Sequence, residues 1–466
     1  MEASTAAAVN GLRAELQGEL VVAGDAGYDE ARRVFNGRVN KRPAFVVRAA
    51  GTADVAVAVK FAREHDLPLT AHCGGHSTGG FSSCDDGLVV DLRPMNAVSV
   101  DPETRAVRVG GGTLQGEMDA ATQEHGLAIT GGRVSNTGVG GLAIGSGSGW
   151  LERKFGLSAD LMTGAEVVTA DGEVVQATDD ENADLFWGIR GGGSNFGIVT
   201  EFRFRAEPIG PMVMAGMLLH PRDAAPEISA LYRDLVAASG DDLGGGVALI
   251  HAPPEPFIPD EWKLKPVTGT IVLWTGAAAE AEEAIAPLKA FGEPILDLVQ
   301  PMPYTALQQL LDGSAAVPGV REYFRVDLFR ELSADAIDAF VSHAAKVPSP
   351  MTQLVLQPLG GKESRVDDHA TPMPGPDVPF GFQALGLWLD PAADEENIAY
   401  IRALSEVMAP WTLDVALPNF NAEDDPPSRL RASYGEENYR RLVTIKDRWD
   451  PDNVFCINKN IPPSGG

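Results

Sequence analysis

Three glycine-rich segments in the first 200 residues limit what this chain can fold into. They lie at residues 74–80, 131–149 and 191–197. Glycine reaches positive φ and carries no Cβ, but it loses more conformational entropy on folding than other residues do. Dense glycine therefore indicates tight turns or close approach of the backbone to another group. Apolar residues such as Val134 and Ile144 argue against a flexible linker in the second segment. We expect the three segments to surround one extended, buried ligand.

The first segment places a histidine inside a glycine turn. Gly74, Gly75, Gly79 and Gly80 can turn successive backbone N–H groups toward one anion, such as a pyrophosphate, with His76 at the mouth of this nest. An ordinary tight turn would carry the same residues. The second segment has a dinucleotide-type glycine spacing, but no clean strand precedes it in a βαβ unit. A nicotinamide-binding Rossmann site is therefore poorly supported.

Length and composition indicate a soluble protein of two domains. A chain of 466 residues with 44% hydrophobic and 22% charged residues can build two sizeable cores. No apolar run approaches the roughly 18 residues that a membrane span needs. The first ten residues contain neither a basic cluster nor a long apolar run, so we expect no signal peptide and a cytoplasmic location.

Charge and cysteine content exclude several kinds of partner. The formal net charge of −28 opposes binding to nucleic acid or to anionic membranes. Such a charge is typical of a well-solvated acidic surface and also of adaptation to salt. Cys73, Cys84 and Cys456 are odd in number and lack metal-ligand spacing. We expect free thiols and no metal site.

Periodicity along the chain predicts an α+β protein. Residues 53–65 have helical spacing and precede the strand that leads into the first glycine segment, and Asp171-Gly172 predicts a hairpin. The middle region alternates strand patterns with helical patterns at 278–290 and 333–345, which is typical of an antiparallel sheet backed by helices. The predicted strands of that sheet lie at 212–220, 246–251, 269–274, 351–357 and 382–388.

Short motifs follow one another in a specific order along the chain. They are Gly74-Gly-His76-Ser77, Gly138-Val-Gly-Gly141, Asp184-Leu-Phe-Trp-Gly-Ile-Arg-Gly-Gly192, Asn195-Phe-Gly-Ile-Val199, Asp450-Pro-Asp-Asn-Val-Phe455 and Asn458-Lys-Asn-Ile-Pro-Pro463. Together they resemble the berberine bridge enzyme-like FAD-linked oxidases of the vanillyl-alcohol-oxidase superfamily. The resemblance implies a PCMH-type FAD-binding domain at residues 1–208, an α+β substrate domain at 209–410, and a C-terminal segment at 411–466 that returns to the first domain.

The resemblance also implies how FAD would be held. His76 matches the histidine through which these enzymes attach the flavin covalently. Many relatives add a second link from a cysteine, but Val134 occupies that position and cannot form a thioether, so we expect a single histidyl linkage. The residues implied along the pyrophosphate are Gly74, Gly75, Ser77 and Gly80. Further cofactor positions are Val134, Thr137, Gly138, Gly141, Gly147, Val199, Asn419 and Asn458.

The reaction implied by the resemblance is an FAD-dependent oxidation. A substrate carbon loses a hydride to the flavin while a base takes a proton, and O₂ reoxidises the flavin with release of H₂O₂. The small polar Thr137 would leave room for oxygen and so favours an oxidase over a dehydrogenase, although it could instead only pack under the ring. The expected substrate is an alcohol or amine of a small organic molecule or natural product. The alternatives are a flavin-dependent oxygenase or dehydrogenase of secondary metabolism, and a non-catalytic flavoprotein that sequesters a drug.

The catalytic base is not evident from the substrate domain. Gln353 and Gln357 would face the cavity if Leu354 and Leu356 pack on the helices, but glutamine does not titrate usefully. Our candidate bases are therefore His251 and Tyr323, each of which could instead be structural.

Two further features concern the substrate. Trp150 and Trp388 could stack on an aromatic substrate or simply pack in the core. A basic pair that relatives carry near residues 371–376 is missing, and Leu417 stands where relatives have a tyrosine. The cavity is therefore expected to suit a neutral or cationic organic molecule. The sequence does not predict the oligomeric state.

Overall fold

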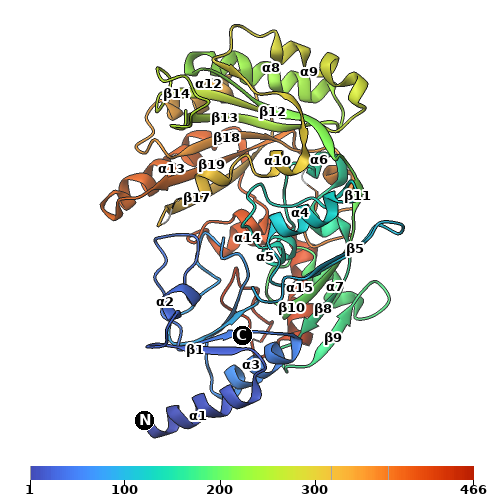
Figure 1. Cartoon of the computed structure of the whole chain (residues 1–466), viewed down its shortest axis with the longest axis vertical. Helices are drawn as coiled ribbons and strands as arrows, with labels where there is room; N and C mark the ends of the chain where they lie inside the picture. Colours follow the sequence, from blue (N-terminus) through green and yellow to red (C-terminus); the bar gives the residue numbers. More distant parts are fainter. Residues whose placement is uncertain (1, 316, 318, 376, 466) are drawn as a thin grey trace.

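The computed structural model describes residues 2–315, 317, 319–375 and 377–465. It confirms the α+β class. Figure 1 shows two layers of structure: the N-terminal part of the chain forms the lower half, and a large sheet backed by helices forms the upper half. No helix among the described residues is long and apolar enough to cross a bilayer.

A four-stranded sheet carries the first glycine segment. Its strands, in spatial order, are β1 (Glu19–Val22), β2 (Phe45–Arg48), β4 (Leu88–Asp91) and β3 (Leu69–His72). Helix α3 (Thr52–Glu64) buries Val55, Ala58, Val59 and Ala62 against this sheet, and α1 (Glu2–Glu15) adds Leu12 to the same core. Strand β3 runs parallel to β4 and ends directly at the first glycine segment.

A five-stranded antiparallel sheet lies beside it. Its strands, in spatial order, are β5 (Val98–Asp101), β6 (Ala106–Gly110), β10 (Ile198–Arg205), β8 (Met162–Val168) and β9 (Val174–Ala177). The predicted hairpin at Asp171-Gly172 joins β8 and β9, and Gly172 has a φ of +71°. The other elements of this part are α2 (Tyr28–Ala31), α4 (Gln115–Gln123), β7 (Leu127–Ala128), α5 (Val139–Ile144), α6 (Glu152–Phe155), α7 (Ala183–Ile189) and β11 (Glu207–Pro208).

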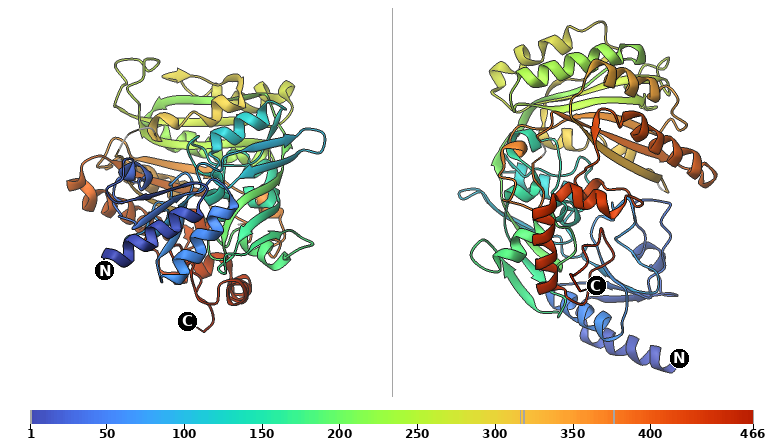
Figure 2. Two further views of the ribbon diagram at one scale, coloured as in Figure 1. Left: turned by 60° about the horizontal axis from the view of Figure 1, so that its bottom comes forward. Right: turned by 180° about the vertical axis from the view of Figure 1, so that it is seen from behind.

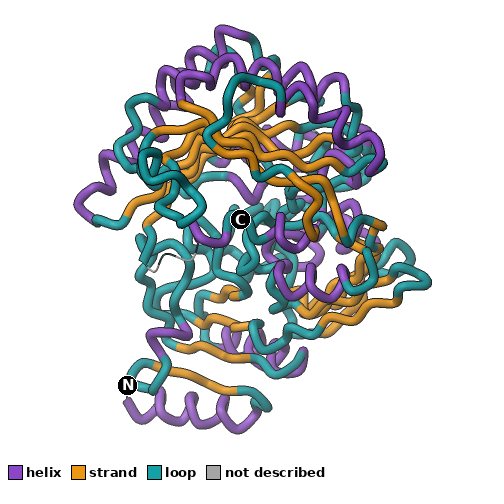
Figure 3. The backbone as a smooth tube through the Cα atoms, turned by 45° about the horizontal axis from the view of Figure 1, so that its top comes forward, coloured by secondary structure: helices purple, strands orange, loops and turns teal. Residues whose placement is uncertain are grey.

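The middle of the chain forms a nine-stranded antiparallel sheet. Its strands are β12 (Met212–Pro221), β13 (Leu243–His251), β14 (Pro266–Trp274), β15 (Leu296–Asp297), β16 (Gln300–Pro303), β17 (Arg321–Phe329), β18 (Gln353–Pro358), β19 (Phe380–Trp388) and β20 (Thr412–Leu413). Its helices are α8 (Ala225–Ala238), α9 (Ala281–Lys289), α10 (Tyr304–Gln308), α11 (Asp312–Ala315), α12 (Ala334–Ala344) and α13 (Asp394–Met408). Figure 3 shows helices covering the outer face of this sheet, and α8, α9, α12 and α13 share one hydrophobic core with it. The inner face of the sheet is not covered by these helices and faces the N-terminal part of the chain. Strand β17 is not among the strands predicted from the sequence.

The end of the chain returns to the first part of the molecule. Helices α14 (Pro427–Tyr434) and α15 (Glu436–Trp449) lie along the five-stranded sheet in the right-hand view of Figure 2. Leu442 and Ile445 of α15 pack with Leu185 and Phe196 in one core. The N- and C-terminal segments of the chain therefore build one layer together.

A buried ion pair fixes this return. The Lys446 ammonium lies 2.6 Å from the Asp450 carboxylate, both side chains are 0% exposed, and the ammonium also donates to the carbonyl oxygens of Asn195 and Phe455. Burial lowers the pKa of Lys446, and the hydrogen bond to Asp450 opposes this shift. Because the pair is dry, removing one partner leaves an uncompensated buried charge.

We expect Lys446→Met to lower the free energy of unfolding by about 3–5 kcal/mol, since the Asp450 carboxylate would remain buried without its cation. Urea unfolding followed by tryptophan fluorescence measures this change. Lys60→Met is the matched control, because Lys60 pairs with Glu173 at the surface with both side chains at least half exposed, and it should change stability by less than about 0.5 kcal/mol. Equal losses in the two variants would contradict the prediction.

Candidate active site

The three glycine segments meet at one cavity of about 400 Å³ between the two layers. The first segment contributes residues 73–78, the second residues 132–145 in part, and the third residues 192–195 and 197. The inner face of the nine-stranded sheet and the C-terminal segment complete the wall. The expected arrangement of the glycine segments around one enclosed space is therefore present.

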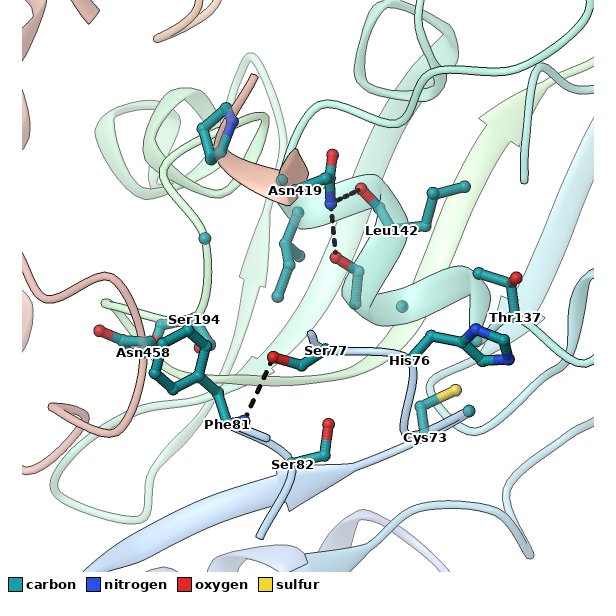
Figure 4. A pocket seen from close by; sticks show the side chains of 18 of the residues that line it. Cys73, His76, Ser77, Phe81, Ser82, Thr137, Leu142, Ser194, Asn419 and Asn458 are labelled. Carbon is teal, nitrogen blue, oxygen red and sulfur yellow. Dashed lines mark hydrogen bonds between the residues drawn. The ribbon is translucent and has the colours of Figure 1, made fainter. Parts of the chain in front are cut away.

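The first glycine segment has a run of amides without hydrogen bonds beside this cavity. Among the described residues, the backbone N–H groups of residues 75–79 donate no hydrogen bond. Gly75 and Gly80 have φ values of +71° and +67°, which turn the chain there. The Gly80 N–H closes the loop on the Ser77 carbonyl oxygen at 2.9 Å, and the Phe81 N–H donates to Ser77 Oγ at 3.2 Å (Figure 4). Consecutive free amides in a glycine turn are suited to an anion.

His76 projects from this loop and lies near Thr137 in Figure 4. Its Nε2 lies 2.7 Å from Asn136 Oδ1, and its ring stacks on Phe35 with centroids 4.3 Å apart. Since the Asn136 oxygen accepts, Nε2 carries the proton and the lone pair is on Nδ1. Burial lowers the pKa of His76, and the Asn136 hydrogen bond opposes this shift. The lowered pKa favours the neutral imidazole over the imidazolium.

The second glycine segment is held by a residue from the end of the chain. Asn419 Nδ2 donates to the carbonyl oxygens of Gly141 and Leu142 at 3.3 and 3.1 Å, as Figure 4 shows, and Asn419 Oδ1 accepts from the Gly147 N–H at 3.1 Å. Asn419 therefore satisfies the C-terminal end of α5. A Cβ at Gly141 would meet no atom within 4 Å, so the space beside this helix is open to a ligand.

A second asparagine from the C-terminal segment leaves a polar atom unmatched. Asn458 Nδ2 donates to the Ser194 carbonyl oxygen at 2.8 Å and to that of Phe455 at 3.1 Å. Its Oδ1 is buried and has no hydrogen-bond partner among the described residues. Buried polar atoms are normally paired, so this oxygen indicates a ligand group at the same point.

These features fit FAD. The free amides of residues 75–79 suit its pyrophosphate, the open surface at Gly141 admits a flat ring, and Asn458 offers an unpaired acceptor. A Cβ at Gly74 would collide with the backbone of Gly138, so glycine is needed where the first two segments touch.

Most of the residues predicted to bind the cofactor line this cavity. Those in its wall are Gly74, Gly75, His76, Ser77, Val134, Thr137, Gly138, Gly141, Val199, Asn419 and Asn458, together with Gln353 from the predicted substrate pocket. The predicted site residues outside its wall are Gly80, Gly147, Trp150, His251, Tyr323, Gln357 and Trp388. Gly80 instead packs on Val39, and Gly147 supports Asn419.

Neither predicted base reaches the cavity. Tyr323 is buried in the core beneath α13, where its hydroxyl donates to Asp424 at 2.8 Å and accepts from Arg402 at 3.3 Å. Burial raises the pKa of Tyr323, so less of the phenolate that would act as a base is present. His251 lies at the far end of β13, and burial lowers its pKa. The prediction that Tyr323 or His251 is the base is therefore wrong. The Tyr323 side chain lies on the core face of β17, and His251 lies at the end of β13 outside the cavity wall.

Three predicted substrate contacts are also structural. Trp388 donates from Nε1 to Asp394 in the core, and Trp150 lies under the Arg133 guanidinium at 4.9 Å. Gln357 donates to Glu152 and faces a separate cavity of about 20 Å³. Of the predicted substrate-pocket residues, only Gln353 remains in the main cavity wall as the structure describes it.

Glu322 lines the cavity and is not among the site residues predicted from the sequence. Strand alternation places Glu322 and Phe324 of β17 on the cavity face and Tyr323 between them on the core face. If residues 321–329 had been predicted as a strand, its alternation would have placed Glu322 and Phe324 on the face opposite to Tyr323.

Comparisons with known proteins agree with this site. The family described as "FAD binding domain" matches residues 43–178, and the family described as "Berberine and berberine like" matches residues 418–462. The chain is 29% identical to (R)-6-hydroxynicotine oxidase of Paenarthrobacter nicotinovorans, over 97% of this chain and 98% of that protein.

Solved structures share the whole architecture. The crystal structure of 6-hydroxy-D-nicotine oxidase from Arthrobacter nicotinovorans superposes with a TM-score of 0.87 at 27% identity, covering 96% of this chain and 98% of that one. The xylooligosaccharide oxidase of Myceliophthora thermophila, at 22% identity and a TM-score of 0.85, shares the fold over 99% of both chains. The cavity and the family matches together indicate an FAD-linked oxidoreductase. The chain belongs to the berberine bridge enzyme-like family of FAD-linked oxidoreductases.

Proposed function

We propose that this enzyme is an oxidase that removes a hydride from the alcohol or amine carbon of a small organic molecule. The observation that carries the proposal is the cavity of about 400 Å³, whose wall contains both the predicted FAD-binding residues and residues from the inner side of the nine-stranded sheet. When bound, FAD supplies a hydride acceptor that O₂ can reoxidise with release of H₂O₂. The nicotine oxidase named by both comparisons supports oxidation of a small molecule.

We propose that His76 tethers the cofactor and that it does so alone. Its Nδ1 lone pair is free, and Asn136 and Phe35 fix the ring at the cavity wall. Val134 lines the same cavity and offers no thiol for a second link. The amides of residues 75–79 would hold the pyrophosphate, and Asn419 would keep α5 in place against the ring.

The sheet side of the cavity would receive the substrate. Phe324, Leu385 and Leu387 would give it an apolar surface, and Thr137 is a small side chain in the same cavity wall. We propose that this small side chain leaves room for O₂, which favours oxidase activity over transfer of electrons to another acceptor.

The test is a panel of alcohols and amines mixed anaerobically with the purified flavoprotein. Bleaching of the flavin absorbance, followed by its return and by peroxide release on admission of O₂, is the expected result. Bleaching without rapid return would indicate a dehydrogenase. Incorporation of ¹⁸O from labelled O₂ into the product would indicate an oxygenase, and tight binding without bleaching would indicate a sequestering protein.

A further inference from the structure

Glu322 is an unpartnered carboxylate in the cavity wall. It is 7% exposed, and neither carboxylate oxygen makes a hydrogen bond or an ion pair with another described residue. Of the described residues that line the cavity, it is the one with a carboxylate. Its neighbours on the sheet are apolar, because Leu387 lies directly opposite on β19 and Phe324 is next along the same face.

Apart from His76, the basic residues of the cavity wall, as far as the structure describes it, are Arg133 and Lys459, and both have other partners. The Arg133 guanidinium lies 3.1 Å from Glu152 and stacks over Trp150. The Lys459 ammonium donates to the carbonyl oxygen of Ala422 and lies 5.6 Å over the Phe81 ring. Neither cation neutralises Glu322.

The main chain fixes Glu322 beside the His76 loop. The side-chain amide of Asn36 donates to the carbonyl oxygens of Glu322 and Thr78, both at 2.9 Å, and its Oδ1 accepts from the Glu322 N–H at 3.0 Å. Arg38 donates to the Glu322 carbonyl oxygen at 3.1 Å and pairs with Glu423 at 2.7 Å. The carboxylate is therefore held in place while remaining free to bind a ligand.

Such an arrangement is costly without a ligand. A buried carboxylate lacking a partner loses its hydration, and burial raises the pKa of Glu322 to about 7, with Arg38 opposing the shift. A cation entering the cavity would restore the lost partner. Perturbed carboxyls in clefts of this kind are commonly functional.

We propose that Glu322 binds a positively charged group of the substrate, so that the enzyme selects cationic amines over neutral molecules of the same shape. The proposal rests on the oxidase function proposed above, because it assigns the substrate class of the same cavity. Phe324, Leu385 and Leu387 bind the apolar part, and Glu322 supplies the charge contact.

The test is calorimetric titration of the flavin-loaded protein with benzyltrimethylammonium, a permanent cation, and with neutral benzyl alcohol. At about pH 8.5 we expect Glu322→Gln to weaken binding of the cation by at least about tenfold and to leave binding of the alcohol unchanged. The control is Glu331→Gln, an exposed residue shortly after β17, which should change neither affinity.

The pH dependence gives a second readout. The carboxyl is neutral below its pKa of about 7 and ionised above it, so wild-type affinity for the cation should fall by about tenfold between pH 8.5 and pH 5.5. Glu322→Gln should abolish this dependence. Among the described residues, Arg38 is the charged group that acts on this carboxyl, and it opposes the effect of burial.

Two results would overturn the proposal: equal affinity of wild type and Glu322→Gln for the cation, or no binding of the cation by wild-type protein with its flavin in place. The oxidase proposal fails separately. Charge-selective binding without bleaching by any amine or alcohol would contradict the oxidase activity and leave the cation site standing. Bleaching by neutral alcohols, with no effect of Glu322→Gln on binding of the cation, would support the oxidase activity and contradict the cation site.

Discussion

Replacing His76 with alanine is expected to abolish acid-stable attachment of the flavin. Wild-type protein should stay yellow after acid precipitation and show flavin fluorescence in a denaturing gel. In His76→Ala the nucleophilic Nδ1 is gone, and Val134 cannot provide a second link, so at least about nine-tenths of the flavin should appear in the acid supernatant.

The control for this experiment is His125→Ala, because His125 is exposed and lies outside the cavity wall. It should retain the acid-stable flavin of the wild type. Release of free FAD from wild-type protein by acid would contradict the tether, while leaving the cavity as a non-covalent FAD site.

Gly74→Ala should cause the largest loss of bound cofactor among single additions of a methyl group to the first glycine segment. The new Cβ would collide with the Gly138 amide nitrogen and the Asn136 carbonyl oxygen. Both are backbone groups that cannot rotate away, so the first two glycine segments must separate. We expect the ratio of flavin to protein absorbance to fall to about a tenth of the wild-type value, and stability to fall by about 1–3 kcal/mol.

Gly51→Ala is the matched control for this substitution. A Cβ at Gly51 would meet no atom within 4 Å, and the backbone there is extended. Flavin content and thermal midpoint should both stay close to wild type. A fully loaded, stable Gly74→Ala protein would show that the two segments need not touch for cofactor binding.

Local sequence patterns were enough to predict most of the cofactor-binding part of the cavity. The glycine segments, the Asp171-Gly172 hairpin and the α3 pattern depend on neighbours within a few residues, and the structure places them as predicted. The placement of Asn419 and Asn458 in the cavity wall came from the family resemblance, since no local pattern links them to residues 141 or 194.

The substrate side could not be predicted in the same way. Strand β17 contains Arg321, Arg325 and Asp327, which look like surface residues in the sequence. These charged side chains can lie in a largely buried strand because each forms an ion pair. Arg321 pairs with Asp394, Arg325 with Asp425, and Asp327 with Arg429, all from distant parts of the chain.

Because these partners are distant in the sequence, the periodicity of residues 321–329 does not predict a buried strand. It therefore does not predict the face on which Glu322 lies. The error in choosing Tyr323 as a base follows directly, because a shift of one residue along a strand reverses the face.

The use of Asn419 and Asn458 to finish the cavity sets the order of events during biosynthesis. Both side chains lie more than 200 residues after the glycine segments, and they hold the second and third of these segments by hydrogen bonds to Leu142 and Ser194. The early sheets can form while synthesis continues, but the FAD site stays open on one side until residues 419 and 458 have emerged. We therefore expect cofactor loading to follow synthesis of residue 458, and a nascent chain halted before residue 419 would carry His76 without the two asparagines that close the site.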